Sequence, residues 1–315
     1  MTDLAPTSPP PAAPSGRWNL AGVVTELRRS RDVTHNIRPP GRIPRAPSRE
    51  ALEGLVKEFT AALFPRHYGQ GDLDEARIDD FVARTLDSAL ERLADQAARS
   101  FAFSRAPDQS AEEEESPEAL AAAGEALARD FAAQTPQIRG LLVSDLQAAY
   151  RGDPAATNFP EILLSYPGVS AILHHRIAHA LHRLGATLLA RLVSDIGRAR
   201  TGVDIHPGAT IGASFFIDHG AGVVIGETAV IGERVRIYQG VTLGARSFPT
   251  DAAGFLIKGA PRHPIVEDDV VIYAGATVLG RVTIGRGATV GGHAWLTRSL
   301  PAGAHFSAPN PVQER

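Results

Sequence analysis

Two pairs of residues in the last third of the chain carry side chains suited to acid–base chemistry, Asp218-His219 and Arg262-His263. A histidine can accept a proton from a hydroxyl group at neutral pH. A carboxylate can orient an imidazole, and a guanidinium can pair with a carboxylate through two hydrogen bonds. Aspartate is also a common turn former, because its side chain accepts hydrogen bonds from nearby backbone amides. Asp218 alone therefore fits a turn as well as a site.

The absence of cysteine narrows the chemistry. The 315-residue chain has no disulfide, no thiolate metal ligand and no cysteine nucleophile. It also lacks the Gly-x-Ser-x-Gly motif of an activated serine. Any nucleophilic chemistry must therefore come from other groups.

Four other histidines, His174, His175, His179 and His182, lie in a predicted helix. His175 and His179 have the spacing of helical metal ligands, but Arg176 stands where a zinc protease has its glutamate. We interpret these histidines as packing and surface residues and predict no metal site.

The two pairs lie within a stretch, residues 203–300, in which a branched aliphatic residue recurs at every sixth position. This period fits neither a helix nor an ordinary strand. It is typical of the hexapeptide class of parallel β-helix, in which three hexads close one triangular coil around stacked aliphatic side chains. The period holds in three registers: Ile205, Ile211 and Ile217; then Ile225, Ile231, Ile237 and Leu243; and, after an interruption, Val266, Ile272, Val278, Ile284, Val290 and Leu296.

The segment before the repeat has helical periodicity. A first helix is expected to begin after the N-cap Ser48 and to end at Pro65. Further helices are predicted over residues 74–106, 117–133, 136–150 and 159–200, with an acidic linker over 112–115 and a break near 167–168. The last of them is expected to cap the open end of the β-helix, whose strand edges otherwise invite aggregation.

These patterns predict an α+β chain with an N-terminal all-α helical domain followed by a left-handed parallel β-helix of hexapeptide repeats. A Pro-rich arm over residues 1–46 is expected to be disordered, apart from one short amphipathic helix between Asn19 and Arg29. The helical domain is expected to cover residues 47–200 and to serve oligomerisation and capping. The β-helix covers residues 201–303, and a short tail follows over 304–315.

Composition limits the partners. A formal net charge of −3 gives no concentrated basic face, so nucleic acid is not expected as a partner. No apolar run approaches the ~18 residues of a membrane span, and the Pro-rich N-terminus lacks the apolar core of a signal peptide. We therefore expect a cytoplasmic protein with no membrane partner.

Several short motifs occur in a fixed order: Asp204-Ile205-His206-Pro207, Asp218-His219, Gly226-Glu227-Thr228, Val241-Thr242-Leu243-Gly244 and Arg262-His263-Pro264. In this combination the chain closely resembles the serine O-acetyltransferases, a family of hexapeptide-repeat acyltransferases. The resemblance covers about residues 140–300. It implies transfer of the acetyl group of acetyl-CoA to the hydroxyl of L-serine, giving O-acetyl-L-serine and CoA in the first step of cysteine biosynthesis.

The resemblance also implies roles for the acid–base residues. His219 would be the general base that removes the serine hydroxyl proton. Asp204 would hold the imidazole in the right tautomer and stabilise its cation. The alkoxide would then attack acetyl-CoA directly in a ternary complex.

Substrate recognition is implied in the same way. Asp153 and Asp218 would receive the amino group of serine, and Arg262 would pair with its carboxylate. His263 would lie beside the hydroxyl or the thioester. Asp153 precedes Pro154, a common turn, so it can contribute only if the helical domain folds over the β-helix.

Acetyl-CoA is expected as a co-substrate, with no permanently bound cofactor. By analogy with related hexapeptide enzymes, it would lie along the later coils in a groove between two subunits of a trimer, or of a dimer of trimers. Small residues there would let the pantetheine arm approach the backbone, although such residues are first of all turn formers. The candidates are Gly244, Ala245, Ala274, Gly275 and Gly292.

Two departures from the family pattern stand out. The repeat is interrupted by a loop over residues 245–261, which is shorter and Gly-rich in many family members. The chain stops at Arg315 without the terminal Ile of members that dock into the next pathway enzyme. We therefore expect no complex with O-acetylserine sulfhydrylase.

Three other functions remain open. The same fold could acetylate a sugar or an antibiotic hydroxyl, although Arg262 would then have no carboxylate to bind. A trimeric β-helix carbonic anhydrase would need three converging histidine ligands. A non-catalytic scaffold would tolerate loss of His219 and Arg262.

Overall fold

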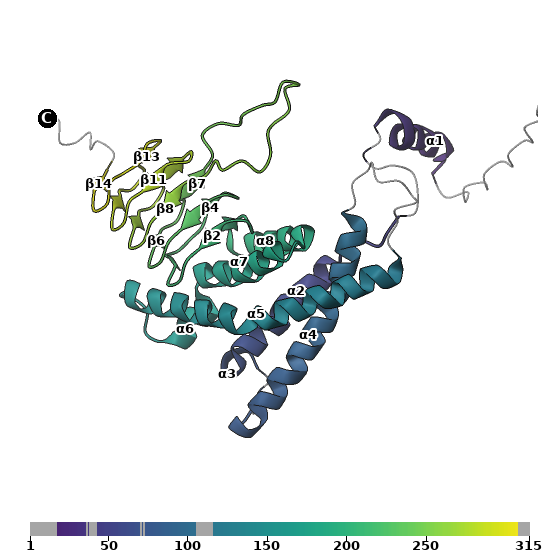
Figure 1. The fold of residues 1–315 in the computed structure, drawn as a ribbon. Coiled ribbons are helices and arrows are strands. Elements are labelled where there is room, and N and C mark those ends of the chain that lie inside the picture. The colour runs from purple at the N-terminus through teal and green to yellow at the C-terminus, as the bar shows by residue number, and fades with distance from the viewer. Residues whose placement is uncertain are drawn as a thin grey trace, which may run out of the picture. The chain divides into compact units, whose positions relative to one another are not determined.

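The computed structural model describes residues 18–35, 37, 43–69, 71, 73–104 and 116–307 (Figure 1). The chain divides into two compact units, residues 1–44 with 105–114, and residues 45–104 with 115–315. In the first unit the structure describes helix α1 (Ala21–Arg29), which confirms the expected short helix, and the π-helical turn η1 (Ser30–Thr34). Half of the arm predicted to be disordered (residues 1–17, 36 and 38–42), the acidic linker and residues 308–315 of the tail lie outside the described residues.

The second unit begins with seven helices: α2 (Arg49–Leu63), α3 (Pro65–Tyr68), α4 (Glu75–Phe103), α5 (Pro117–Gly152), α6 (Phe159–Ser165), α7 (Pro167–Arg183) and α8 (Thr187–Thr201). Their starts follow from local chemistry. Ser48 accepts the amide hydrogen of Ala51, as predicted, and Asp74 and Asn158 cap α4 and α6 in the same way. No helix in the described part of the chain has the length and apolar character needed to cross a bilayer.

Two predicted helix boundaries were wrong. The separate helices expected over 117–133 and 136–150 form one helix, α5, which continues through Pro136. Proline costs a helix one backbone hydrogen bond. Thr135 and Ile138 beside it are buried, and α5 packs against both α4 and α7, so tertiary packing outweighs that cost. The segment over 159–200 also breaks a second time, between α7 and α8.

The repeat forms the predicted left-handed parallel β-helix. Its strands are β1 (Asp204–Ile205), β2 (Thr210–Ile211), β3 (Phe216–Ile217), β4 (Val224–Ile225), β5 (Val230–Ile231), β6 (Arg236–Ile237), β7 (Thr242–Gly244), β8 (Ile265–Val266), β9 (Val271–Ile272), β10 (Thr277–Leu279), β11 (Thr283–Ile284), β12 (Thr289–Val290), β13 (Trp295–Leu296) and β14 (His305–Phe306). They make three sheets, here named A (β1-β4-β7-β10-β13), B (β2-β5-β8-β11) and C (β3-β6-β9-β12-β14). The last strand, β14, lies beyond the end at residue 303 that the sequence suggested.

The strand register confirms the hexad pattern. Ile205, Ile225 and Leu243 align across sheet A, and the repeated aliphatic positions are all buried. Each therefore adds to one continuous apolar column inside the coils. The repeat lengthens only at the corner between Ile217 and Ile225 and at the loop over residues 245–261.

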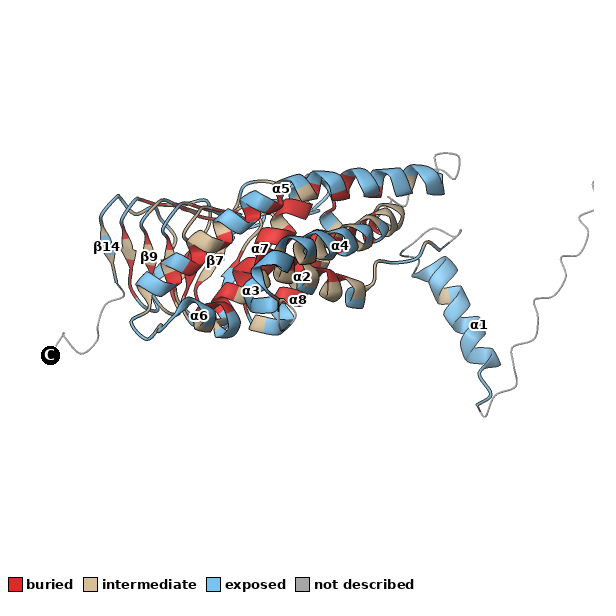
Figure 2. Cartoon of the chain, turned by 90° about the horizontal axis from the view of Figure 1, so that it is seen from below, coloured by how far each residue is buried: buried red, intermediate tan, exposed pale blue. Residues whose placement is uncertain are grey.

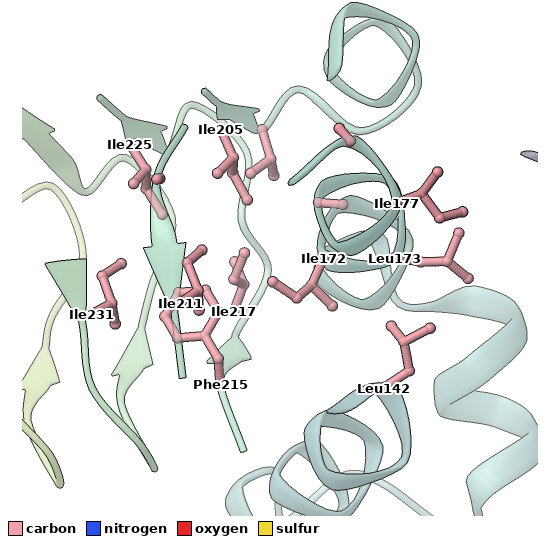
Figure 3. Close-up of a cluster of buried hydrophobic side chains, with 14 of the residues drawn as sticks. Leu142, Ile172, Leu173, Ile177, Ile205, Ile211, Phe215, Ile217, Ile225 and Ile231 are labelled. Carbon is pink, nitrogen blue, oxygen red and sulfur yellow. The ribbon is translucent and has the colours of Figure 1, made fainter. Parts of the chain in front are cut away.

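Helices α5, α7 and α8 cover the first coil, which confirms the predicted cap. Figure 2 shows α7 coloured as buried over most of its length. In Figure 3, Ile172 of α7 points toward Ile217 of the coil, and Leu142 of α5 points toward Leu173 of α7. The open edge of β1 is covered by α8, where the Ser194 hydroxyl donates to the carbonyl oxygen of Ile205.

Candidate active site

The first corner that carries predicted site residues joins β3 of sheet C to β4 of sheet A, and we call this position in every coil the C–A corner. His219 adopts a left-handed conformation there, with φ of 58°, and Gly220 follows with φ of 97°. A Cβ on Gly220 would lie 2.9 Å from Ile217 and 3.1 Å from Val203, so only glycine fits. The turn leaves the His219 side chain 73% exposed and the Asp218 side chain only 13% exposed.

Asp218 makes two contacts with cationic or titratable groups. Its Oδ2 accepts a hydrogen bond from Arg236 Nη2 at 2.9 Å, and its Oδ1 lies 3.9 Å from His219 Nε2. The Arg236 guanidinium carbon is 5.1 Å from the ring centre of Phe216 and 4.7 Å from that of Tyr238. Asp218 therefore stands between a stacked guanidinium and the imidazole.

Helix α5 delivers Asp153 to the same corner. Asp153 is the C-cap of α5, and its Oδ1 accepts the amide hydrogen of Ala155 at 2.8 Å, as a turn residue would. Its Oδ2 accepts a hydrogen bond from the Tyr166 hydroxyl at 2.6 Å. That bond, ahead of weaker attraction to Arg236 and His219, holds the pKa of Asp153 below its ordinary value. Asp153 can therefore act as a turn residue and as a site residue at the same time.

The pKa of Tyr166 also shows that Tyr166 lies close to Asp153 and Asp218. The hydrogen bond to Asp153 is the main reason that the pKa of Tyr166 is raised to about 12, and the charge of Asp218 contributes as well. Asp153, Tyr166, Asp218, Arg236 and His219 therefore form one electrostatic group, which we call the acidic corner.

Asp204 lies near the acidic corner without joining it. It pairs with Val224 across sheet A, and the neighbouring Gly202 carbonyl accepts the amide hydrogen of Gly222 at 2.9 Å. No hydrogen bond or ion pair joins the Asp204 carboxylate to His219 or to any other described side chain. Its role in orienting the imidazole stays a prediction.

Arg262 and His263 lie at a different corner, between sheets A and B, which we call the A–B corner. Arg262 Nη2 donates to Glu227 Oε2 at 2.6 Å, and its backbone amide donates to Thr228 Oγ1 at 2.9 Å. His263 Nδ1 accepts the amide hydrogen of Thr228 at 3.0 Å, so the neutral ring carries its proton on Nε2. Burial is the main reason that the pKa of His263 lies below its ordinary value.

Close packing fixes the His263 ring. A Cβ on Gly226 would lie 2.0 Å from His263 Cδ2, so the glycine leaves the space that the ring fills. His263 is only 6% exposed. This corner is therefore a rigid unit that offers a guanidinium and an imidazole N–H.

The predicted site residues divide between two different corners of the β-helix. Asp218 and His219 lie at the C–A corner, while Arg262 and His263 lie at the A–B corner. Among the described side chains, no hydrogen bond or ion pair bridges the two corners. The physical reason is that two corners of a β-helix are separated by the strands of one sheet and by the packed side chains inside the coils. A single chain therefore does not bring all of these residues together.

The residues proposed for CoA are divided in the same way. Ala274, Gly275 and Gly292 lie on the C–A corner of later coils, where Gly275 has φ of 69°. A Cβ on Gly275 would lie 2.4 Å from His293 Nδ1. Gly244 and Ala245 lie instead where β7 leads into the loop over residues 245–261. These small residues therefore flank two corners and not one groove of a single chain.

Sequence reasoning missed two residues of the acidic corner, Tyr166 and Arg236. The sequence around Tyr166 carries no pattern that predicts its hydrogen bond, because helix packing brings Asp153 to it. Arg236 could have been found from the repeat, since residues in register in successive coils lie side by side. Arg236 is one coil beyond Phe216, which lies close to Asp218 in the chain.

The α7 histidines serve packing, as predicted. His175 is buried, and burial lowers its pKa well below the ordinary value. His174 Nδ1 and His179 Nδ1 lie 2.7 Å and 2.8 Å from backbone carbonyl oxygens. Within the described ranges no three His, Asp or Glu side chains are placed to hold a metal ion.

A cavity of about 480 Å³ lies elsewhere, among α2, α3, α6, α7 and α8. None of the sequence-predicted site residues lines it.

The fold and these corners define a hexapeptide-repeat transferase, and the family model for bacterial transferase hexapeptide (six repeats) matches residues 263–298. The plasmid serine acetyltransferase of Synechococcus elongatus is 50% identical over 292 residues, which is 92% of this chain and 91% of that protein. The serine acetyltransferase of Bacillus subtilis is 49% identical over 46% of this chain and 63% of its own length. The chain therefore belongs to the serine acetyltransferase family.

Solved structures agree. Serine acetyltransferase isoform 3 of Entamoeba histolytica, in complex with cysteine, matches with a TM-score of 0.69 and 31% identity over 92% of this chain and 90% of that one. Soybean serine acetyltransferase complexed with serine matches with a TM-score of 0.51 and 30% identity over 84% and 98%. The similarity thus includes the helices as well as the coils.

Proposed function

We propose that this chain transfers the acetyl group of acetyl-CoA to the hydroxyl of L-serine, giving O-acetyl-L-serine and CoA, the first step of cysteine biosynthesis. The observation that carries the proposal is the acidic corner, where Asp153 and Asp218, from distant parts of the chain, stand beside the exposed His219. Family membership gives independent support, because the similar proteins are serine acetyltransferases.

In the proposed reaction, His219 removes the proton of the serine hydroxyl as that oxygen attacks the thioester carbonyl of acetyl-CoA. The tetrahedral intermediate collapses by breaking the C–S bond, and the proton passes from His219 to the leaving thiolate. No acyl-enzyme is needed, in keeping with a chain without cysteine. Asp204 is proposed to orient the imidazole when substrate is bound.

Serine recognition requires both corners. The two carboxylates of the acidic corner suit the substrate ammonium, and Arg262 suits the substrate carboxylate. Since these groups lie on different corners of one chain, we propose that the C–A corner of one subunit faces the A–B corner of its neighbour in a closed trimer. Acetyl-CoA would lie in that groove, along Ala274, Gly275 and Gly292 on one side and Gly244 and Ala245 on the other.

The test measures CoA release from acetyl-CoA with L-serine, homoserine, a sugar or no acceptor, for the wild type and His219→Ala. We expect serine to be the preferred acceptor. Loss of the base should lower kcat about 10²- to 10⁴-fold. Equal rates with serine and without acceptor would refute the proposal, and preference for a sugar would replace it with the alternative acetyltransferase.

A further inference from the structure

Arg236 is a partly buried charged group that the proposed chemistry does not use. It lies on β6, directly opposite Phe216 of β3 in the parallel register of sheet C. Its guanidinium lies over the rings of Phe216 and Tyr238, within the range of cation–π attraction. Its side chain is 27% exposed. The guanidinium is therefore held in one place before any substrate arrives.

The stacking directs the guanidinium toward Asp218. Arg236 Nη2 donates to Asp218 Oδ2 at 2.9 Å, which leaves Oδ1 on the side of His219. Arg236 Nε is buried and has no hydrogen-bond partner among the described residues. An unsatisfied buried donor costs free energy, so the Asp218 contact and the two rings are what keep the side chain here.

The charges of the corner give this contact a consequence. Asp153 and Asp218 together carry two negative charges, and Arg236 adds one positive charge close enough to affect Asp153 as well. The sum of −1 matches the single positive charge of an amino group. Without the guanidinium, two carboxylates would face one ammonium, and the repulsion between them would turn Asp218 away from the shared ligand.

We propose that Arg236 is a positioning residue that fixes the Asp218 carboxylate to receive the substrate amino group and matches the charge of the corner to one ammonium. This inference rests on the proposed function, since it assumes an amino-acid acceptor. Arg236 touches neither substrate nor acetyl-CoA in this scheme and acts only through Asp218.

The first experiment compares steady-state kinetics of the full chain carrying Arg236→Met or Arg236→Lys with the wild type. Loss of a charge-assisted contact should raise KM for serine about 10- to 100-fold in the methionine variant. KM for acetyl-CoA and kcat should stay within about threefold, because the amino group is bound equally in ground and transition states. The Arg236→Lys variant should show a smaller rise in KM for serine, since lysine keeps the positive charge but lacks the planar guanidinium fork.

Arg234→Met is the matched control. Arg234 lies in the same coil and its Nε donates to Asp269 at 2.6 Å, yet it is away from the acidic corner. This variant should leave both KM values unchanged. A serine KM of Arg236→Met within twofold of wild type would overturn the proposal. So would a rise in both KM values together with a lower melting temperature, because that pattern marks a purely structural role.

A second experiment remains informative if part of the variant protein misfolds. The ratio of kcat/KM for serine to that for 3-hydroxypropanoate, which lacks the amino group, does not depend on the active fraction. We expect Arg236→Met to reduce this ratio about tenfold or more, and to cause no further reduction in an Asp218→Asn background. An unchanged ratio would refute the inference, whereas a wild type that ignores serine would refute the proposed function.

Discussion

At the scale of single residues, Tyr166 and Asp153 show how a hydrogen bond tunes a carboxylate. The Tyr166 hydroxyl donates to Asp153 Oδ2 at 2.6 Å and is the largest cause of the lowered pKa of that carboxyl group. Only the ionised carboxylate attracts an ammonium. A lowered pKa therefore keeps Asp153 ready to bind as the pH falls.

Tyr166→Phe should weaken serine binding and make it more sensitive to acid. Without the hydroxyl, the pKa of Asp153 rises toward the ordinary value of about 3.9, so binding is lost at a higher pH on acidification than in the wild type. Calorimetric titration with serine in the absence of acetyl-CoA, repeated from neutral to acidic pH, measures this shift. Tyr150→Phe is the control, because Tyr150 is 42% exposed and its ring packs against Phe159 in a tilted arrangement. Superimposable pH profiles for wild type and Tyr166→Phe would contradict the prediction.

At the scale of elements, the end of helix α5 lies directly on sheet C. A Cβ on Gly152 would lie 2.9 Å from Phe216 Cδ1 and 3.7 Å from Arg236 Nη1. Gly152 thus lets the helix end approach the strand closely enough for Asp153 to reach the acidic corner. The connection between the helical segment and the β-helix therefore contributes to the proposed site as well as capping the coils.

Gly152→Ala should push α5 away from β3. We expect a loss of about 1–3 kcal/mol in the free energy of unfolding from overpacking, and a raised KM for serine because Asp153 moves with the helix end. Denaturant unfolding and steady-state kinetics measure the two effects. Gly140→Ala in the same helix is the control, since a Cβ there meets nothing within 4 Å. The control should be neutral or stabilising by up to about 1 kcal/mol. Equal behaviour of both variants would show that the close approach is unimportant.

At the scale of the whole molecule, the separation of the two functional corners is the main constraint. The acidic corner and the pair Arg262-His263 cannot meet within one coil, because the filled β-helix lies between them. A closed ring of identical subunits brings different corners together at each interface. The proposed site would therefore belong to the assembly.

Mixing inactive variants tests this directly. His219→Ala and Arg262→Ala should each be nearly inactive alone. After they are unfolded together and refolded, every mixed trimer contains one interface with both corners intact, so random assortment should restore about one quarter of the sites. The measurement is serine-dependent CoA release. A mixture of Arg262→Ala with His263→Ala, which share one corner, should gain no site with both of these residues intact, and full inactivity of the first mixture would contradict a shared site.

Much of the fold could be predicted because its signals are local. The aliphatic residue at every sixth position specified the buried column from Ile205 to Leu296, and Ser48 marked a helix start through its own hydrogen bond. Pro136 misled because the cost of proline in a helix is local, whereas the packing of α5 against α4 and α7 is not.

The sequence by itself determined the coils, the adjacent pair Asp218-His219 and membership of a family of acetyltransferases, since each depends on residue types at short, regular spacing. Only the tertiary structure decided that Asp153 reaches the corner, that Tyr166 and Arg236 hold the two carboxylates, and that Arg262 lies at a different corner from them. The physical reason is that these relations depend on how α5 packs against sheet C and on the three-sided section of the coil. Neither the packing of α5 nor the shape of the coil produces a repeated pattern in the sequence from which these contacts could be predicted.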